Sequence, residues 1–141
     1  MGFLSAAVSF ELRLAQIRDL VKSMNTELIV YGRLPLMVTE QCIIKRSEGR
    51  CTCSSPLMLS DRKGSVFPVV PEPEHRNVIL NSKKLYMADK LDEVRECGLW
   101  GMRLMFTTES ARECVEVLRA YKGGSYTPND LTRGLYYRTE K

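Results

Sequence analysis

Apolar positions in the first part of the chain follow two different periods. Residues 2–8 are short and apolar, which predicts a strand. Over residues 10–24 apolar side chains return every three to five positions, which predicts a helix with Ser9 as its N-cap. Residues 27–31 (ELIVY) are typical of a buried strand. Residues 1–40 therefore predict a strand–helix–strand portion of an α/β fold.

The regular pattern then gives way to a segment rich in turn residues, residues 41–86. Its run LMLSDRKGSVFPVV predicts a β-hairpin with a turn at Asp61–Gly64, where the glycine supplies a positive φ. Pro68 predicts that the second strand of the hairpin lies at a sheet edge. Two more short strands are predicted on either side of Asn81-Ser82.

The α/β rhythm resumes in residues 87–124, which predict a helix, a strand and a second helix. The helices are expected over residues 90–97 and 109–121, and a buried strand over residues 99–107. A tail, residues 125–141, closes the chain. We thus predict a single α/β domain over residues 1–141, with a cysteine-bearing hairpin insertion between two βα portions.

So few parallel strands cannot close a barrel, and an open parallel sheet exposes pairing groups at its sides. We therefore expect the chain to pair with a second copy of itself, as a homo-oligomer, or to be part of something longer.

Composition indicates a globular protein. The chain has 141 residues, 44% of them hydrophobic and 27% charged. Its apolar stretches are far shorter than the roughly 20 residues of a membrane helix, so no membrane association is expected. The first residues lack the features of a secretory signal, and we expect a cytoplasmic protein. Five cysteines in a reducing compartment are expected to be thiols or ligands.

The net charge of +4 is mild, but its distribution is uneven. The segment that holds the cysteine cluster could attract a polyanion, or could present an ordinary solvated face. Its basic residues are Lys45, Arg46, Arg50, Arg62, Lys63, Arg76, Lys83 and Lys84.

Three cysteines, Cys42, Cys51 and Cys53, lie close together in the sequence, and the only histidine is His75. Three thiolates and an imidazole would suit zinc or an iron–sulfur cluster. One cysteine could instead be a nucleophile activated by the histidine, or all three could be thiols without a role. Glu40, after a strand-like run, is a possible acid, and the glycines form no phosphate loop, so no nucleotide cofactor is indicated.

Several motifs together resemble the collagenase-like peptidases, family thirty-two of the unassigned (U) class. The resemblance covers almost the whole chain and keeps the order of the motifs, which are VYGRLPLMVTEQC, LSDRKGSVFPV, HRNVILNSKKLYM, RLMFTTES and TRGLYYR. Members of that family are longer TIM-barrel-like proteins, and this chain resembles their latter part. The resemblance thus implies a fragment: a partial TIM-like (β/α) barrel with a β-hairpin insertion.

The family name implies a peptidase, a hydrolase acting on protein or peptide substrates, although this fragment alone is expected to be inactive. Similar proteins hydroxylate RNA bases or a quinone precursor and carry an iron–sulfur cluster on four cysteines. Cys42 and one or both of Cys51 and Cys53 match such ligand positions, and His75 stands where the family commonly has the remaining cysteine.

Three functional hypotheses follow from the resemblance. The leading one is a collagenase-like protease whose catalytic residues cannot be assigned. The others are an iron–sulfur protein that assists hydroxylation, with RNA as a possible partner, and a non-catalytic piece that completes the barrel of a partner chain. Substrate contacts are expected from Glu40, Arg62, Lys63 and Arg76.

Overall fold

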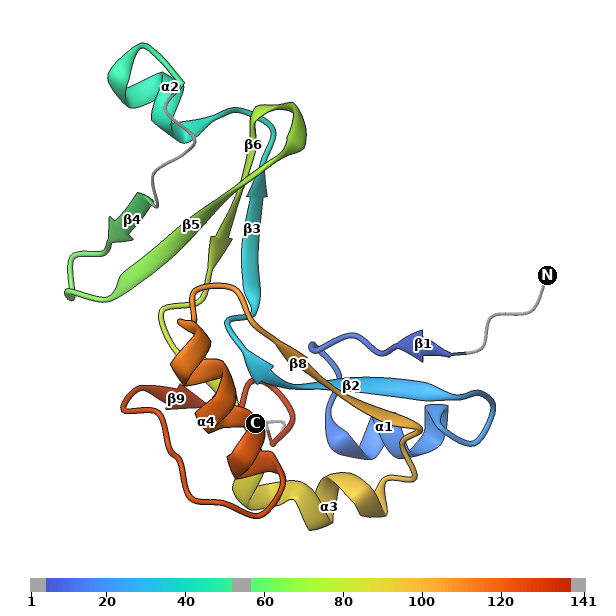
Figure 1. The fold of residues 1–141 in the computed structure, drawn as a ribbon. Coiled ribbons are helices and arrows are strands. Elements are labelled where there is room, and N and C mark those ends of the chain that lie inside the picture. The colour runs from blue at the N-terminus through green and yellow to red at the C-terminus, as the bar shows by residue number, and fades with distance from the viewer. Residues whose placement is uncertain (1–4, 52–56, 138–141) are drawn as a thin grey trace. The chain divides into compact units, whose positions relative to one another are not determined.

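The chain is a mixed α/β protein with two separate sheets (Figure 1). The computed structural model describes residues 5–51 and 57–137, leaving out the side chains of residues 47 and 48. It divides into two compact units: unit 1 comprises residues 1–32 and 84–141, and unit 2 comprises residues 33–83. Neither sheet closes into a barrel within the described residues. The α/β class is thereby confirmed.

Unit 1 is organised around one strand, β2. This strand pairs in parallel with β1 and β8 and in antiparallel with β7, and β7 pairs in parallel with β9. The strands are β1 (Ala6–Ala7), β2 (Thr26–Gly32), β7 (Lys84–Tyr86), β8 (Gly101–Met105) and β9 (Leu131–Thr132).

Helices also contribute buried apolar side chains to unit 1. They are α1 (Leu14–Leu20), the 3-10 turn η2 (Ala88–Lys90), α3 (Leu91–Glu96) and α4 (Ala111–Tyr121); α1 and α3 are drawn below β2 and β8 in Figure 1. Ile17, Val94 and Val117 are fully buried, as are Leu28 and Val30 on β2. These side chains form the core of unit 1.

Unit 2 is an antiparallel sheet in the order β3-β6-β5-β4, with one short helix. Its elements are β3 (Pro35–Thr39), α2 (Ile43–Glu48), β4 (Leu57–Ser60), β5 (Val66–Glu72), the 3-10 turn η1 (Pro73–His75) and β6 (Arg76–Leu80).

The two ends of unit 2 are joined to each other. The Asn81 N–H donates to the Leu34 carbonyl at 2.9 Å, and the Arg33 guanidinium donates to the carbonyls of Asn81 and Ser82.

Several local predictions are confirmed. Parallel β1 and β2 with α1 between them form the expected strand–helix–strand portion. β4 and β5 form the hairpin, and Gly64 has a φ of +81° in its turn. Strands β6 and β7 lie on either side of Asn81-Ser82, although they belong to different sheets.

The prediction that Pro68 marks an edge strand is wrong. Its strand, β5, pairs with β4 on one side and β6 on the other. The registered pairs with β6 run only from Val69 to Glu72, so Pro68 lies just outside that ladder and removes no hydrogen bond from it.

Helix α1 begins later than the apolar period predicts. Ser9 is not its N-cap, because the Ser9 hydroxyl instead accepts from the Glu11 N–H and the chain turns there before the helix starts. The N-cap is Arg13, whose N–H donates to the Gln16 side chain at 3.0 Å.

Two other expectations differ from the structure. The strand predicted to be buried over residues 99–107 is β8, where Met102 and Arg103 are exposed. Among the described residues, β8 pairs with β2 alone. Trp100, next to this strand, is 60% exposed. The strand-like run before Glu40 is strand β3, whereas helix α2 was not predicted.

Within the described residues, none of the helices is both long and apolar enough to cross a membrane.

A buried carboxylate joins three elements of unit 1. The Glu109 side chain is fully buried, and its oxygens accept from Lys84 Nζ at 3.1 Å, from the Tyr31 hydroxyl at 3.3 Å and from the N–H groups of Thr107 and Thr108. Burial alone would raise the pKa of Glu109, but the Thr107 N–H and Lys84 together hold that pKa below its usual value.

We expect Glu109→Gln to destabilise unit 1 by about 2 kcal/mol at pH 7, since Lys84 would lose the closer of its two carboxylates. The lowered pKa means that Glu109 contributes stability above its unfolded pKa of about 4.3, and that this stability is lost as the pH falls through the folded pKa. The difference between the two proteins should therefore shrink in acid. Denaturant titrations followed by Trp100 fluorescence would measure it.

Glu116→Gln is the matched control, because the ion pair of Glu116 with Arg112 on α4 lies at the surface and should change stability by less than about 0.5 kcal/mol. A difference between Glu109→Gln and the native protein that stays constant from pH 7 to pH 3 would contradict the assignment.

Candidate metal centre

Cys42 lies at the first turn of α2, where it acts as the N-cap. Its Sγ accepts from the Lys45 N–H at 3.4 Å, which satisfies one of the backbone donors that begin a helix. Only 5% of Cys42 is exposed, and Cys42 is not in a disulfide. The helix thus holds this sulfur in one place at the end of the sheet.

Asn77 fixes the start of α2 against the sheet. It is fully buried on β6, and its Oδ1 accepts from the Ile43 N–H at 2.8 Å. The neighbouring chain is held as well, since the Thr39 hydroxyl donates to the Gln41 carbonyl at 2.9 Å. Cys42 is therefore positioned by two strands, β3 and β6, as well as by its own helix.

His75 is presented by an unusual turn between β5 and β6. Glu74 and His75 have φ values of 63° and 62°, a region that residues other than glycine, asparagine and aspartate seldom occupy. The flanking pair Glu72 and Arg76 closes the turn in register. Such backbone conformations cost free energy and persist where the surroundings impose them, often at functional sites.

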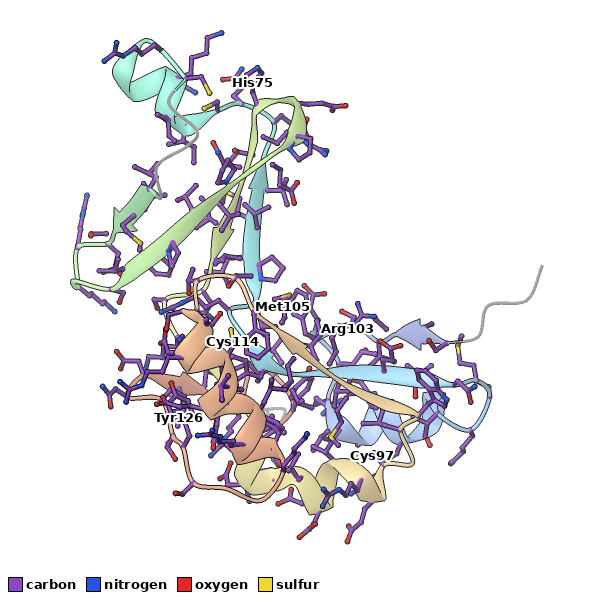
Figure 2. All side chains as sticks on the ribbon, viewed as in Figure 1. His75, Cys97, Arg103, Met105, Cys114 and Tyr126 are labelled. Carbon is purple, nitrogen blue, oxygen red and sulfur yellow. The ribbon has the colours of Figure 1, made fainter. Side chains whose placement is uncertain are left out.

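The Cys51 sulfur lies close to both Cys42 and His75. Its Sγ lies 3.7 Å from Cys42 Sγ and 3.5 Å from His75 Nδ1. Three of the four ligand positions expected from the sequence are thus gathered at one end of unit 2, where Figure 2 shows His75 beside α2. The fourth, Cys53, lies outside the described residues.

In the structure Cys51 is disulfide-bonded, whereas Cys42 is not. Among the residues that the structure describes, no group of three or more His, Cys, Asp or Glu side chains forms a set ready to hold a metal ion. Cys51 could become a ligand only as a thiolate, that is, after reduction of its disulfide.

The donor set and its spacing nevertheless fit a single soft metal ion. Zn–S bonds of about 2.3 Å and Zn–N bonds of about 2.05 Å in a tetrahedron place two sulfurs about 3.8 Å apart and a sulfur and a nitrogen about 3.6 Å apart. The observed separations of 3.7 Å and 3.5 Å are close to these values. In a four-iron cluster each thiolate binds a different iron, which spreads the ligands farther apart.

A groove of about 440 Å³ opens beside Cys42 and His75. Glu40, one of the predicted substrate contacts, lines it together with Gln41, Lys45 and Arg46. The groove therefore combines a thiol and an imidazole with two cations and one carboxylate.

The other predicted substrate contacts lie apart from this groove. Arg62 and Lys63 are exposed in the turn before β5, at the opposite end of that strand from His75. With seven residues at about 3.3 Å each, β5 places the turn that holds Arg62 and Lys63 roughly 23 Å from His75. Arg76 follows His75 directly, and its guanidinium lies 3.9 Å from Glu72.

Comparison of the chain with protein-family models, curated proteins and solved structures finds no match. The resemblance to the collagenase-like peptidases remains a prediction from the motifs.

The two remaining cysteines lie in unit 1 (Figure 2). Cys97 is buried after α3, and its thiol donates to the Glu93 carbonyl at 3.3 Å. Cys114 is half-buried on α4. The burial of Cys97 is typical of a small packing residue.

Sequence reasoning did not identify Asn77 as part of the site. The available signal was a polar amide at the start of the apolar run NVIL, in a strand that is otherwise buried. A buried asparagine is retained where its amide meets a backbone group, so such a residue indicates a local structural bond.

We expect Asn77→Ala to loosen the start of α2, because the part-buried Ile43 N–H would lose its acceptor at a cost of about 1–3 kcal/mol. Cys42, now 5% exposed, should then be alkylated roughly tenfold faster by iodoacetamide. Mass spectrometry of the Cys42 peptide would give the rate. Asn81→Ala is the control, since the Asn81 side chain bonds only an exposed turn N–H. Equal rates in the two variants would contradict the role of Asn77.

Proposed function

We propose that unit 2 is a metal-binding module in which Cys42, Cys51 and His75 hold a single ion. The observation that carries the proposal is the position of Cys51 Sγ, 3.7 Å from Cys42 Sγ and 3.5 Å from His75 Nδ1. The ligands come from the start of α2, the segment after it and the β5–β6 turn, so one ion would join parts of unit 2 that are distant in the sequence.

The sequence adds Cys53 as the fourth ligand, which would complete a three-sulfur, one-nitrogen set. Zinc agrees with the spacing better than an iron–sulfur cluster does, and the cluster becomes the alternative. When bound, the ion would stabilise the thiolates and the local fold. The protein's part is to hold the thiolates and the imidazole in place, with Asn77 fixing the backbone just after Cys42.

We further propose that the chain is part of a larger protein of the collagenase-like peptidase family. Support comes from the parallel strands β1, β2 and β8 of unit 1, with helices between them in the order of a (β/α) barrel. Among the described residues, strand β8 pairs with β2 along one edge, and a further barrel strand would pair along its other edge.

The metal proposal predicts that protein reduced without oxygen binds one zinc or iron ion per chain. Cys42→Ser, Cys51→Ser and His75→Ala should each weaken binding at least tenfold, because each removes a ligand. Elemental analysis would give the amount of metal, and competition with a chromogenic chelator would give the affinity. A brown colour with several iron ions per chain would favour a cluster instead.

Cys114→Ser is the matched control for these variants, since it removes a thiol from α4 in unit 1 and should leave metal binding unchanged. The proposal fails if the reduced native chain retains less than about half an equivalent of metal, or if all the variants bind it equally.

A thiol peptidase is a second candidate function, favoured by the groove that Cys42 and His75 both line. In that case Cys42 would attack a peptide carbonyl and His75 would accept its proton. The groove residues Lys45 and Arg46 could bind an acidic part of the substrate. The hypotheses of hydroxylation and of a non-catalytic piece that completes a partner's barrel remain predictions.

A thiol peptidase should cleave gelatin in the presence of a metal chelator and lose that activity in Cys42→Ala, because the nucleophile would be gone. Gel electrophoresis of the digested gelatin measures this. Cys114→Ala should retain activity. If activity is absent or is unaffected by Cys42→Ala, the thiol mechanism is excluded while the metal proposal stands.

A further inference from the structure

The turn between β5 and β6 has a backbone conformation that one of its residues disfavours. Glu74 has a φ of 63° and a ψ of 25°, and His75 has a φ of 62°, so two consecutive residues are left-handed. Glycine and asparagine are the usual residues in such a turn, and histidine tolerates the left-handed region better than most side chains. Glutamate has no such tolerance, so the free-energy cost of the turn falls mainly on Glu74.

The strands on either side of the turn favour this conformation. Glu72 pairs with Arg76 in register, which leaves only residues 73–75 to reverse the direction of the chain. Sliding of either strand is opposed by the rest of the sheet, because β5 also pairs with β4 and β6 also pairs with β3. The bond from Asn77 to the Ile43 N–H holds β6 as well. The register therefore favours the left-handed turn, whereas the residue type of Glu74 opposes it.

The turn determines where the imidazole of His75 lies. In the left-handed turn, Nδ1 of His75 is 3.5 Å from Cys51 Sγ. Because the backbone dihedrals of a residue set the direction of its side chain, relaxation to right-handed backbone would carry the ring away from this sulfur. The side chain of Glu74 is exposed, and the backbone of Glu74 continues directly into that of His75. Glu74 thus acts on the imidazole through the backbone.

We propose that residue 74 sets the metal affinity of the site through the left-handed turn, and that Glu74 is a positioning residue for His75. This inference rests on the proposed metal site and adds what determines its affinity. The imidazole reaches the ion only in molecules whose turn is left-handed, so the apparent affinity falls with the fraction of molecules in that state. A residue at position 74 that tolerates left-handed backbone raises this fraction, and a less tolerant residue lowers it.

The carboxylate of Glu74 offers a second route to the affinity, because a negative charge near a site attracts a cation. Four substitutions separate charge from conformation. Glu74→Asp keeps the charge and Glu74→Asn removes it, and both of these residues tolerate left-handed backbone. Glu74→Ala removes the charge without adding that tolerance. Glu74→Val removes the charge and adds a β-branched side chain, which disfavours the turn further.

Zinc affinity is measured on the full chain without a histidine tag, reduced without oxygen, by competition with a chromogenic chelator. We expect Glu74→Asp and Glu74→Asn to bind zinc roughly threefold more tightly than the native chain, and Glu74→Ala to bind it about as tightly. Glu74→Val should bind zinc roughly tenfold more weakly, because it depopulates the left-handed turn.

Proton NMR of the imidazole gives a readout of His75 itself. His75 is the only histidine of the chain, so its ring signals need no assignment by mutation. With one equivalent of zinc, the ring signals should shift fully in Glu74→Asn. In Glu74→Val a large part of the ring signal should keep the position that it has without metal, because thiolates alone then hold the ion.

Gly64→Val is the matched control for strain. Gly64 has a φ of +81° in the turn before β5, at the opposite end of that strand from His75. A Cβ at Gly64 would meet no atom within 4 Å, so the substitution adds backbone strain without a clash. It should lower the denaturation midpoint of the chain while leaving the zinc affinity of the folded protein and the His75 signals unchanged.

Each result decides between the proposals. If the reduced native chain binds no zinc, the proposed metal site fails and this inference fails with it. If zinc binds and the affinity follows the charge at position 74, or if Gly64→Val weakens binding as much as Glu74→Val does, the metal site stands and the positioning role of Glu74 is wrong. Should Glu74→Val not fold, equal zinc affinities of Glu74→Asn and Glu74→Ala would overturn the positioning role in the same way.

Discussion

The pairing of β2 on both of its edges is the constraint on which unit 1 depends. Its side chains Leu28, Val30 and Tyr31 are fully buried, and its carbonyls receive hydroxyl hydrogen bonds of 2.6 Å from Tyr121 and Tyr136. Strand β8 lies so close that a Cβ at Gly32 would stand 2.1 Å from the Met105 carbonyl oxygen. Helix α4 and the C-terminal segment, which supply the two tyrosines, thus both depend on β2.

Unit 2 is organised differently, since its candidate site lies at the end of a sheet rather than in a core. A buried amide, a helix N-cap and a turn with two positive φ values each fix one part of the site. Each of these features is local and modest in free energy. An ion bound to the thiolates and the imidazole would add a much stronger link between them.

The sequence predicted those features that local chemistry controls. The β4–β5 hairpin followed from a turn with a glycine at its end, and β2 followed from its run of apolar residues. The gathering of Cys42, Cys51 and His75 was also anticipated, because these were the residue types suited to one metal. Features that depend on pairing partners were missed: Pro68 was misread because the extent of the β6 ladder is a property of the sheet, not of the proline.

Helix α2 and the role of Asn77 could not be predicted from the local sequence either, because both depend on residues elsewhere in the fold. A six-residue helix shows less than two turns of periodicity, and the bond from Asn77 to Ile43 joins residues 34 positions apart. Likewise Ser9 has the chemistry of an N-cap, but its hydroxyl is used in a preceding turn. The residue types were informative, whereas the partner of each polar group depended on the tertiary fold.

The hydrogen bonds that join the two ends of unit 2 also bear on how this unit is connected to the rest of the chain. The chain leaves β2 after Gly32 and returns at Lys84, and Gly32 lies opposite Leu85 in the β2–β7 pair. Because the two ends of this segment lie close together, it can be inserted into a fold at a point where a short hairpin turn would also fit. Residues 33–83 thus have the architecture of an inserted domain, which could be gained, lost or exchanged in evolution while the sheet of unit 1 stayed intact.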